Sequence, residues 1–190
     1  MDEDGATTSP GAKKATHPLG MILIGLLLSA VLYLGIRGAK QSHTLDKGAP
    51  APGFSLARYE GGTLSLSALR GKVVLLDFWA SWCEPCIAEI PSLVKLAREY
   101  EPKGLVLVAA NWDEGANAKA SVGVFVARRA PDLAPYIVFA DTAAAAHYQI
   151  DSLPTVYFID REGKILGSYF GYSPEAAMRS RIEQALSSAR

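Results

Sequence analysis

Two cysteines separated by two residues constrain this chain more than any other feature. Cys83 and Cys86 are the only cysteines among 190 residues, and they closely follow an apolar stretch at residues 73–79. An intrachain disulfide can therefore join only these two, in a ring of four residues. Disulfides typically stabilise by about 2 to 4 kcal/mol, and the effect grows with loop length. A ring this small stabilises little, so we expect the pair to serve exchange chemistry.

The spacing of the pair has a physical reason if a helix begins at Cys83. Unpaired backbone N–H groups and the positive end of the helix dipole favour a thiolate there. Cysteines in such sites have pKa values of about 3.5 to 7.5, against about 8.5 for a free thiol. Cys86 would lie one turn deeper on the same face, where it can attack a mixed disulfide on Cys83. Pro85 suits the first turn, where its missing N–H is not needed.

Metal or haem binding is the competing interpretation of the dithiol. The remaining zinc ligands would have to come from His17, His43 and His147, and none has the spacing of a ligand. Haem attachment needs histidine directly after the second cysteine, where this chain has Ile87. We therefore predict no metal and no cofactor. A dithiol module that handles metal or haem without redox turnover stays as the alternative function.

The residues before the cysteines resemble a known family. The pattern Asp-Phe-Trp-Ala-x-Trp-Cys-x-Pro-Cys at residues 77–86 resembles the thioredoxin superfamily, and with Glu84 it is most similar to TlpA/ResA-like thiol-disulfide oxidoreductases. The resemblance covers roughly residues 47–189. It implies an α/β fold, a thioredoxin-like three-layer sandwich with a central mixed sheet and an inserted strand-helix. A peroxiredoxin-like peroxidase is the other alternative, but Leu76 and Ala80 occupy the Pro and Thr places of its peroxidatic pattern.

An apolar segment near the N-terminus predicts a membrane anchor. Residues 19–36 are 18 uncharged, largely aliphatic residues, which is about the length needed to cross a bilayer. A cleaved signal peptide is the alternative, but its apolar core is usually about 7 to 15 residues, and no clear cleavage site follows Leu34. The predicted organisation is a disordered cytosolic tail at 1–18, a transmembrane anchor at 19–36, a linker at 37–48 and a thioredoxin-like domain at 49–190.

Charge excludes one class of partner and leaves the orientation in the membrane open. Lysine plus arginine and aspartate plus glutamate both number 19, so no basic field or phosphate-binding loop suggests nucleic acid. Basic residues flank the anchor on both sides, as Lys13 and Lys14 before it and Arg37 and Lys40 after it. The positive-inside rule therefore does not decide the orientation.

Apolar periodicity and turn residues predict the order of elements in the domain. A Gly61-Gly62 turn suggests an N-terminal hairpin, and residues 84–100 carry a helical apolar stripe. The expected strands are 49–56, 61–66, one that begins at 73 and runs into the cysteine pair, 105–110, 136–140, 154–160 and 165–170, and the expected helices are 84–100, 116–129, 142–148 and 174–188.

A second diagnostic stretch is Leu153-Pro154-Thr155, at the head of an apolar strand. Proline cannot donate to a strand ladder, so it needs a special place there. In thioredoxin-like proteins the matching residues carry a cis proline opposite the dithiol, so the resemblance implies a cis Leu153–Pro154 bond. It also implies that these three residues, with Trp82 and Pro85, bind the substrate.

Two acidic residues are candidates for the chemistry. Asp77 lies inside an apolar strand, where burial should raise its pKa. The matching residue of thioredoxins assists proton transfer at the buried cysteine, and the alternative is a carboxylate in a salt bridge. Glu84 either disfavours the Cys83 thiolate or is a solvated acid favourable to the helix dipole. Trp82 should be partly exposed, and Trp79 should be buried with its N–H hydrogen-bonded.

Together these residues predict a membrane-anchored thiol-disulfide oxidoreductase. Its catalytic residues would be Cys83, Cys86, Asp77 and Glu84. The resemblance implies single-pass anchoring in the bacterial inner membrane, with the domain in the periplasm or otherwise outside the cytoplasm. Its partners would be the lipid bilayer, protein thiols or disulfides in the cell envelope, and a membrane electron donor of the DsbD/CcdA type. We expect a reductant, for example in cytochrome c maturation, although the direction depends on a redox potential that residues alone do not set.

Overall fold

The computed structural model describes residues 22, 24–30 and 45–188, and the chain divides into two units, residues 1–41 and 42–190. Of the predicted anchor at 19–36, residues 22 and 24–30 are helical and exposed, and the rest lies outside the described residues. Among the described residues, no helix has the length and apolar character to cross a membrane. The predicted tail at 1–18 and most of the linker at 37–48 also lie outside the described residues.

Within residues 45–188, seven strands form one sheet in the order β2-β1-β5-β4-β3-β6-β7. Their bounds are β1 Ser55–Arg58, β2 Thr63–Ser65, β3 Val73–Trp79, β4 Leu105–Asn111, β5 Ile137–Phe139, β6 Thr155–Ile159 and β7 Ile165–Phe170. The strands β3, β4 and β5 are parallel neighbours, while β6 pairs antiparallel with both β3 and β7. The predicted central mixed sheet is therefore confirmed.

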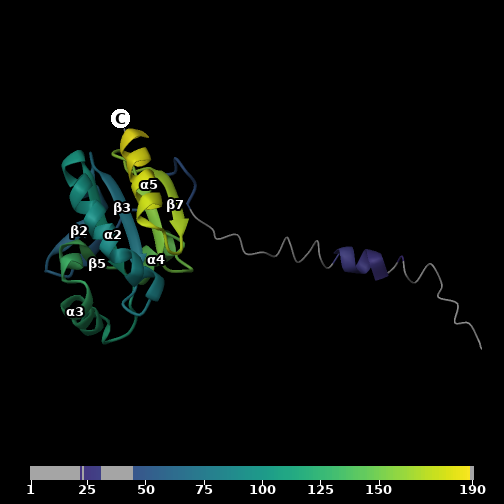
Figure 1. Ribbon diagram of the computed structural model, residues 1–190, viewed down its shortest axis with the longest axis horizontal. Helices are drawn as coiled ribbons and strands as arrows, with labels where there is room; N and C mark the ends of the chain where they lie inside the picture. Colours follow the sequence, from purple (N-terminus) through teal and green to yellow (C-terminus); the bar gives the residue numbers. More distant parts are fainter. Residues whose placement is uncertain (1–21, 23, 31–44, 189–190) are drawn as a thin grey trace, which may run out of the picture. The chain divides into compact units, whose positions relative to one another are not determined.

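Helices cover both faces of this sheet (Figure 1). Their bounds are α2 Glu84–Tyr100, α3 Ala118–Arg129, α4 Thr142–His147 and α5 Glu175–Ser188, with short 3-10 helices η1 Leu66–Leu69, η2 Glu101–Lys103 and η3 Pro131–Tyr136. Apolar side chains of α2 and α5 pack on one face, and those of α4 pack on the other. The result is the predicted three-layer arrangement.

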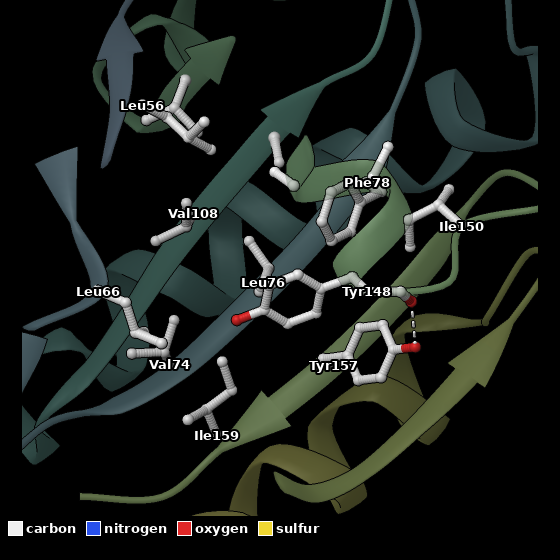
Figure 2. Packing of buried hydrophobic residues seen from close by; sticks show 14 of the residues in the cluster. Leu56, Leu66, Val74, Leu76, Phe78, Val108, Tyr148, Ile150, Tyr157 and Ile159 are labelled. Carbon is white, nitrogen blue, oxygen red and sulfur yellow. Dashed lines mark hydrogen bonds between the residues drawn. The ribbon is translucent and has the colours of Figure 1, made fainter. Parts of the chain in front are cut away.

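Alternation along β3 sends its side chains into separate cores, as expected for a strand buried on both faces. Val74, Leu76 and Phe78 face the layer of α4, where Tyr148 and Tyr157 pack beside them (Figure 2). Val73 and Leu75 face α2 and α5. Asp77 lies two residues after Leu75, so its side chain is on the same face of β3 as Val73 and Leu75. The strand therefore directs this carboxyl toward the layer that contains the cysteines.

The predicted first strand, residues 49–56, is wrong in its bounds. The strand β1 begins at Ser55 and ends at Arg58, and Pro50 makes only an isolated bridge with Lys164. Pro50 and Pro52 have no N–H to donate, so this segment cannot form a continuous ladder. The second strand of the hairpin is also shorter than the predicted 61–66, because the chain enters η1 at Leu66.

Candidate functional site

The two cysteines form a disulfide at the start of α2, with an S–S distance of 2.01 Å. Cys83 is the N-cap residue, and its Sγ accepts a hydrogen bond from the Cys86 backbone N at 3.3 Å. The residue has extended backbone dihedrals, as an N-cap position requires. Both cysteines are buried, Cys83 at 5% exposure and Cys86 at 1%. The predicted helix start is therefore confirmed, and Cys83 is the slightly more accessible sulfur.

Three predicted site residues are next to the cysteines in the chain. Trp82 is 68% exposed, which confirms its predicted exposure. Pro85 lies in the first turn of α2, as predicted from its missing N–H. The Glu84 side chain is exposed, and its carboxylate lies 3.7 Å from a guanidinium nitrogen of Arg129 on α3. A solvated acid in the first turn of the helix describes this geometry better than a carboxylate held against the sulfurs.

The predicted cis peptide bond is present between Leu153 and Pro154. Leu153 packs against the cluster that contains both cysteines, so the loop belongs to the same part of the core as the dithiol. The Pro154 carbonyl accepts a hydrogen bond from Gly171 N at 2.9 Å, and Thr155 is buried with its hydroxyl donating to the Ser152 carbonyl. Fold and sequence thus bring together two segments that lie about seventy residues apart.

Asp77 is a buried carboxyl, as predicted, at 1% exposure. Burial raises the pKa of this group well above its ordinary value, and the nearby Glu89 raises it further. Its Oδ1 has no hydrogen-bond partner among the described residues. No ion pair involves Asp77 within residues 45–188, so the salt-bridge alternative is not supported.

Glu89 is a site residue that the sequence interpretation missed. It lies three residues after Cys86 on α2 and is only 1% exposed. Burial raises its pKa to about 7, although the Ser173 backbone N, which donates to Oε2 at 3.1 Å, lowers it in part. Its Oε1 and the hydroxyl of Tyr169 on β7 lack partners among the described residues. An acid inside the apolar stripe of 84–100, one turn after a cysteine, was the signal that could have identified it.

The prediction for Trp79 is right about its burial and wrong about its hydrogen bond. Its ring is fully buried, as predicted, and packs against Phe125 with ring centroids 5.2 Å apart. Its Nε1, however, makes no hydrogen bond with any described residue. The side chain is surrounded by apolar groups of the cysteine-containing cluster, which offer contacts but no acceptor.

A polar brace, formed by Ser81, Asn111 and Asp113, ties the loop before the cysteines to the end of β4. The Asp113 carboxylate accepts hydrogen bonds from Ser81 N at 2.7 Å and from Ser81 Oγ at 2.5 Å. Asn111 donates to the same carboxylate at 3.2 Å and accepts from Asp113 N at 3.2 Å. The brace was not predicted, because its residues come from separate segments.

This arrangement can perform two-electron thiol-disulfide exchange. One sulfur lies at a helix N-terminus, where a thiolate is favoured. The second sulfur is within bonding distance, and two carboxyls with raised pKa values belong to the same layer. Of the two, Glu89 has a pKa of about 7, which allows it to hold or release a proton near neutral pH.

Comparisons with known proteins agree with this geometry. The model of the Redoxin family matches residues 46–186. The thioredoxin-like protein YneN of Bacillus subtilis is 33% identical over 168 residues, covering 85% of this chain and 96% of that protein. The thiol-disulfide oxidoreductase ResA of the same organism is 30% identical over 158 residues, covering 83% and 85%. A crystal structure of a putative thiol:disulfide interchange protein DsbE from Chlorobium tepidum superposes with a TM-score of 0.68 at 35% identity, covering 75% of this chain and 99% of that one.

Proposed function

The chain belongs to the Redoxin family and to the TlpA/ResA-like thiol-disulfide oxidoreductases of the thioredoxin superfamily, and we propose that it reduces protein disulfides outside the cytoplasm while anchored to a membrane. Its substrates are protein thiols or disulfides. The observation that carries the proposal is the position of Cys83, the N-cap of α2, bonded to Cys86 one turn away. Helix termini of this kind favour the thiolate that exchange requires.

In the first step, the Cys83 thiolate of the reduced protein attacks one sulfur of a substrate disulfide. A new bond forms between Cys83 and that sulfur, while the substrate disulfide breaks and its other sulfur leaves as a thiolate. The N–H groups of the first turn of α2 stabilise the Cys83 thiolate before the attack. Glu84, which is exposed and close to Arg129, modulates this charge only weakly.

In the second step, Cys86 attacks the mixed disulfide at Cys83, which restores the intramolecular bond and releases the reduced substrate. Two electrons have then passed from the dithiol to the substrate. Cys86 must first lose its proton, and Asp77 accepts it, with Glu89 beside it as a second acceptor. Burial raises the pKa of both carboxyls, that of Glu89 to about 7, so each can take up a proton more readily than an exposed acid.

Substrate binding is assigned to the segments next to the disulfide, of which Trp82 is exposed and Leu153 is half-buried. Leu153 and Pro154 precede Thr155, the first residue of β6, and Leu153 packs against the cluster that contains the cysteines, while Trp82 and Pro85 are neighbours of the cysteines in the chain. The backbone of Leu153 makes no hydrogen bond with described residues outside its own segment. An extended peptide could therefore pair with it by strand addition, which depends little on side-chain identity.

Electrons would reach the dithiol from a membrane donor of the DsbD/CcdA type, and apocytochrome c is a candidate substrate. Both assignments rest on the family and on the apolar segment 19–36, whose length suits a membrane anchor. Expression of the full chain followed by an alkaline carbonate wash tests the anchor. Retention in the membrane pellet supports it, and release into the supernatant contradicts it.

The direction of exchange is tested by the redox potential of the Cys83–Cys86 pair, measured by equilibration with glutathione. Reductants such as thioredoxin lie near about −270 mV and the strong oxidant DsbA near about −120 mV. A potential close to the first value, with a mostly reduced pair trapped by alkylation in the native envelope, supports the reductase. A potential close to the second, with a mostly oxidised pair, contradicts it.

A further inference from the structure

A cleft beside the disulfide is not used by the steps above. It is lined by Trp82, Trp112 and Glu114 and has a volume of about 320 Å³. Trp82 directly precedes the attacking cysteine, while Trp112 and Glu114 follow the end of β4. Any side chain that enters this cleft from a bound peptide therefore belongs to a residue close to the peptide's own cysteine.

The walls of the cleft are held in place by hydrogen bonds. The Trp112 backbone N donates to the Trp79 carbonyl at 2.8 Å, so the residue after β4 is tied to the end of β3. The brace from Asp113 to Ser81 adds two bonds between the same loops. The two tryptophans thus belong to loops that the fold joins directly, and a ligand need not first assemble the cleft.

The chemistry of the cleft favours a cation. Indole is the best aromatic partner for an ammonium or guanidinium group, and the cleft offers two indoles. Glu114 is exposed and forms no ion pair within residues 45–188, so its carboxylate is open to a ligand's cation. The carboxylate of Asp113 already accepts two hydrogen bonds from Ser81, so it is not available to a ligand in the same way. A second exposed acid, Glu84, follows the first cysteine in the chain.

We propose that this cleft binds a lysine or arginine side chain adjacent to the reacting cysteine of the substrate, so that the protein prefers protein disulfides with basic flanking residues. The inference rests on the proposed function and adds a substrate class to it. Two tryptophans and a carboxylate that has no ion pair in the part of the chain that the structure describes account for the preference. A purely apolar residue would gain only the contact with the rings.

The test uses reduced protein and three short peptides, each with one cysteine blocked as a mixed disulfide with mercaptoethanol. The residues flanking the cysteine are lysines, norleucines or glutamates. Second-order rates of reduction are measured for all three, together with the rate for the small neutral hydroxyethyl disulfide. We expect the lysine peptide to react roughly 3- to 10-fold faster than the norleucine peptide and the glutamate peptide to react slowest. The advantage of lysine should shrink in high salt.

Two variants locate the effect. Glu114→Gln removes the charge at nearly constant volume, and Trp112→Leu removes the ring while keeping an apolar side chain. Each should bring the lysine-to-norleucine ratio toward one, and the ratio within one variant cancels any change in intrinsic reactivity. Glu162→Gln is the control, because this exposed acid follows β6, whose end pairs with the start of β3, away from the disulfide. It should keep the parent ratio.

The outcomes separate this inference from the proposed function. A parent ratio near one, a preference for norleucine, or a ratio that Glu114→Gln leaves unchanged overturns the cation-binding cleft. If hydroxyethyl disulfide is still reduced in that case, the oxidoreductase function stands. If neither the peptides nor the small disulfide is reduced, both proposals fail.

Discussion

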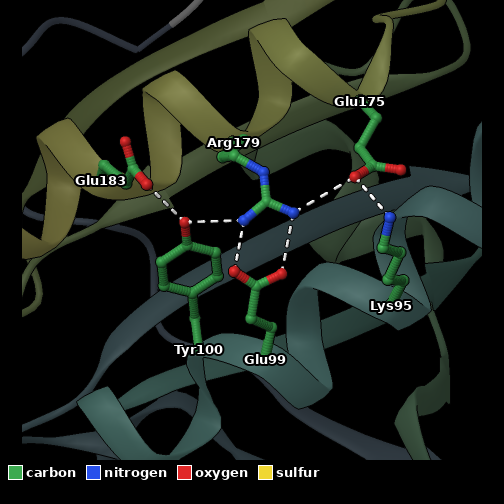
Figure 3. A network of polar contacts seen from close by, with 6 residues as sticks. All are labelled: Lys95, Glu99, Tyr100, Glu175, Arg179 and Glu183. Atoms are coloured by element: carbon green, nitrogen blue, oxygen red, sulfur yellow. Dashed lines mark hydrogen bonds and ion pairs between the residues drawn. The ribbon is translucent and has the colours of Figure 1, made fainter.

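Two polar clusters join α2 to the C-terminal part of the domain, and they differ in how their hydrogen bonds are satisfied. The first, which we call the clasp, lies between α2 and α5 (Figure 3). It consists of Lys95, Glu99, Tyr100, Glu175, Arg179 and Glu183. Arg179 donates to both carboxylate oxygens of Glu99, to Glu175 at 3.2 Å and to Tyr100 at 3.1 Å. Each of its charged groups has a partner.

The second, the buried carboxyl cluster, consists of Asp77, Glu89 and Tyr169. Here one oxygen of each side chain lacks a partner among the described residues. Burying an unpaired polar group is costly, so such groups persist where they serve something other than stability. The contrast teaches that the clasp joins the helices through paired charges, whereas the buried cluster keeps carboxyls with raised pKa values in the interior, where we propose that they exchange protons with the dithiol. Each prediction below changes one side of this comparison.

The largest effect is expected from the dithiol, to which we assign the buried cluster as a proton acceptor. Cys83→Ser should abolish reduction of insulin or a model disulfide, because the attacking sulfur is gone. Cys86→Ser should instead accumulate a mixed disulfide on Cys83, visible on non-reducing gels. If the Cys83 variant traps partners and the Cys86 variant does not, the two roles are reversed.

Glu89→Gln should change how stability depends on pH. The pKa of Glu89 is raised from 4.5 to about 7 in the folded protein, so between these values the folded state holds a proton that the unfolded state has lost. Stability gained at low pH should therefore be lost as pH rises toward 7, by on the order of 3 kcal/mol.

The measurement is urea denaturation of the oxidised protein between pH 4 and pH 8. The variant should lose less stability over this range, with Asp77 contributing the remaining slope in the same direction. The exposed acid Glu162 provides the control as Glu162→Gln. Parallel curves for the parent and the Glu89 variant would show that Glu89 does not titrate with folding.

Asp77→Asn should slow resolution of the mixed disulfide roughly tenfold and initial attack by less. A buried base matters most for deprotonating Cys86, and Glu89 remains as a second acceptor. Single-turnover kinetics with a fluorescent peptide disulfide separates the two steps. Unchanged rates for both steps would remove Asp77 from the mechanism.

The smallest effect is expected from the clasp. Arg179→Ala should lower Tm by roughly 2 °C, because several partners of one guanidinium are lost, and it should leave exchange rates at the parent value. Thermal unfolding and insulin reduction measure the two properties. Arg128→Ala, on an exposed face of α3, is the control. A large loss of activity in the Arg179 variant would mean that the clasp and the buried cluster are coupled.

The elements with a strong local pattern could be predicted well. The helix at 84–100 has the predicted bounds and β3 begins at Val73 as predicted, since a proline in the first turn and a largely apolar run are local signals. The N-terminal strand was misplaced, because apolar residues between prolines at 50 and 52 resemble a strand without being able to donate to one.

The sequence by itself determined which atoms can exchange electrons, where the attacking cysteine lies on its helix and which carboxyl of β3 is buried. These features depend on spacings of a few residues, which local backbone geometry converts directly into position. Only the tertiary structure decided that Glu89 lies near Asp77, that Ser173 donates to Glu89, and that Trp112 and Trp82 line one cleft. These contacts join residues from separate elements, and such pairings are set by how the sheet orders its strands and packs its helices, which no local pattern encodes.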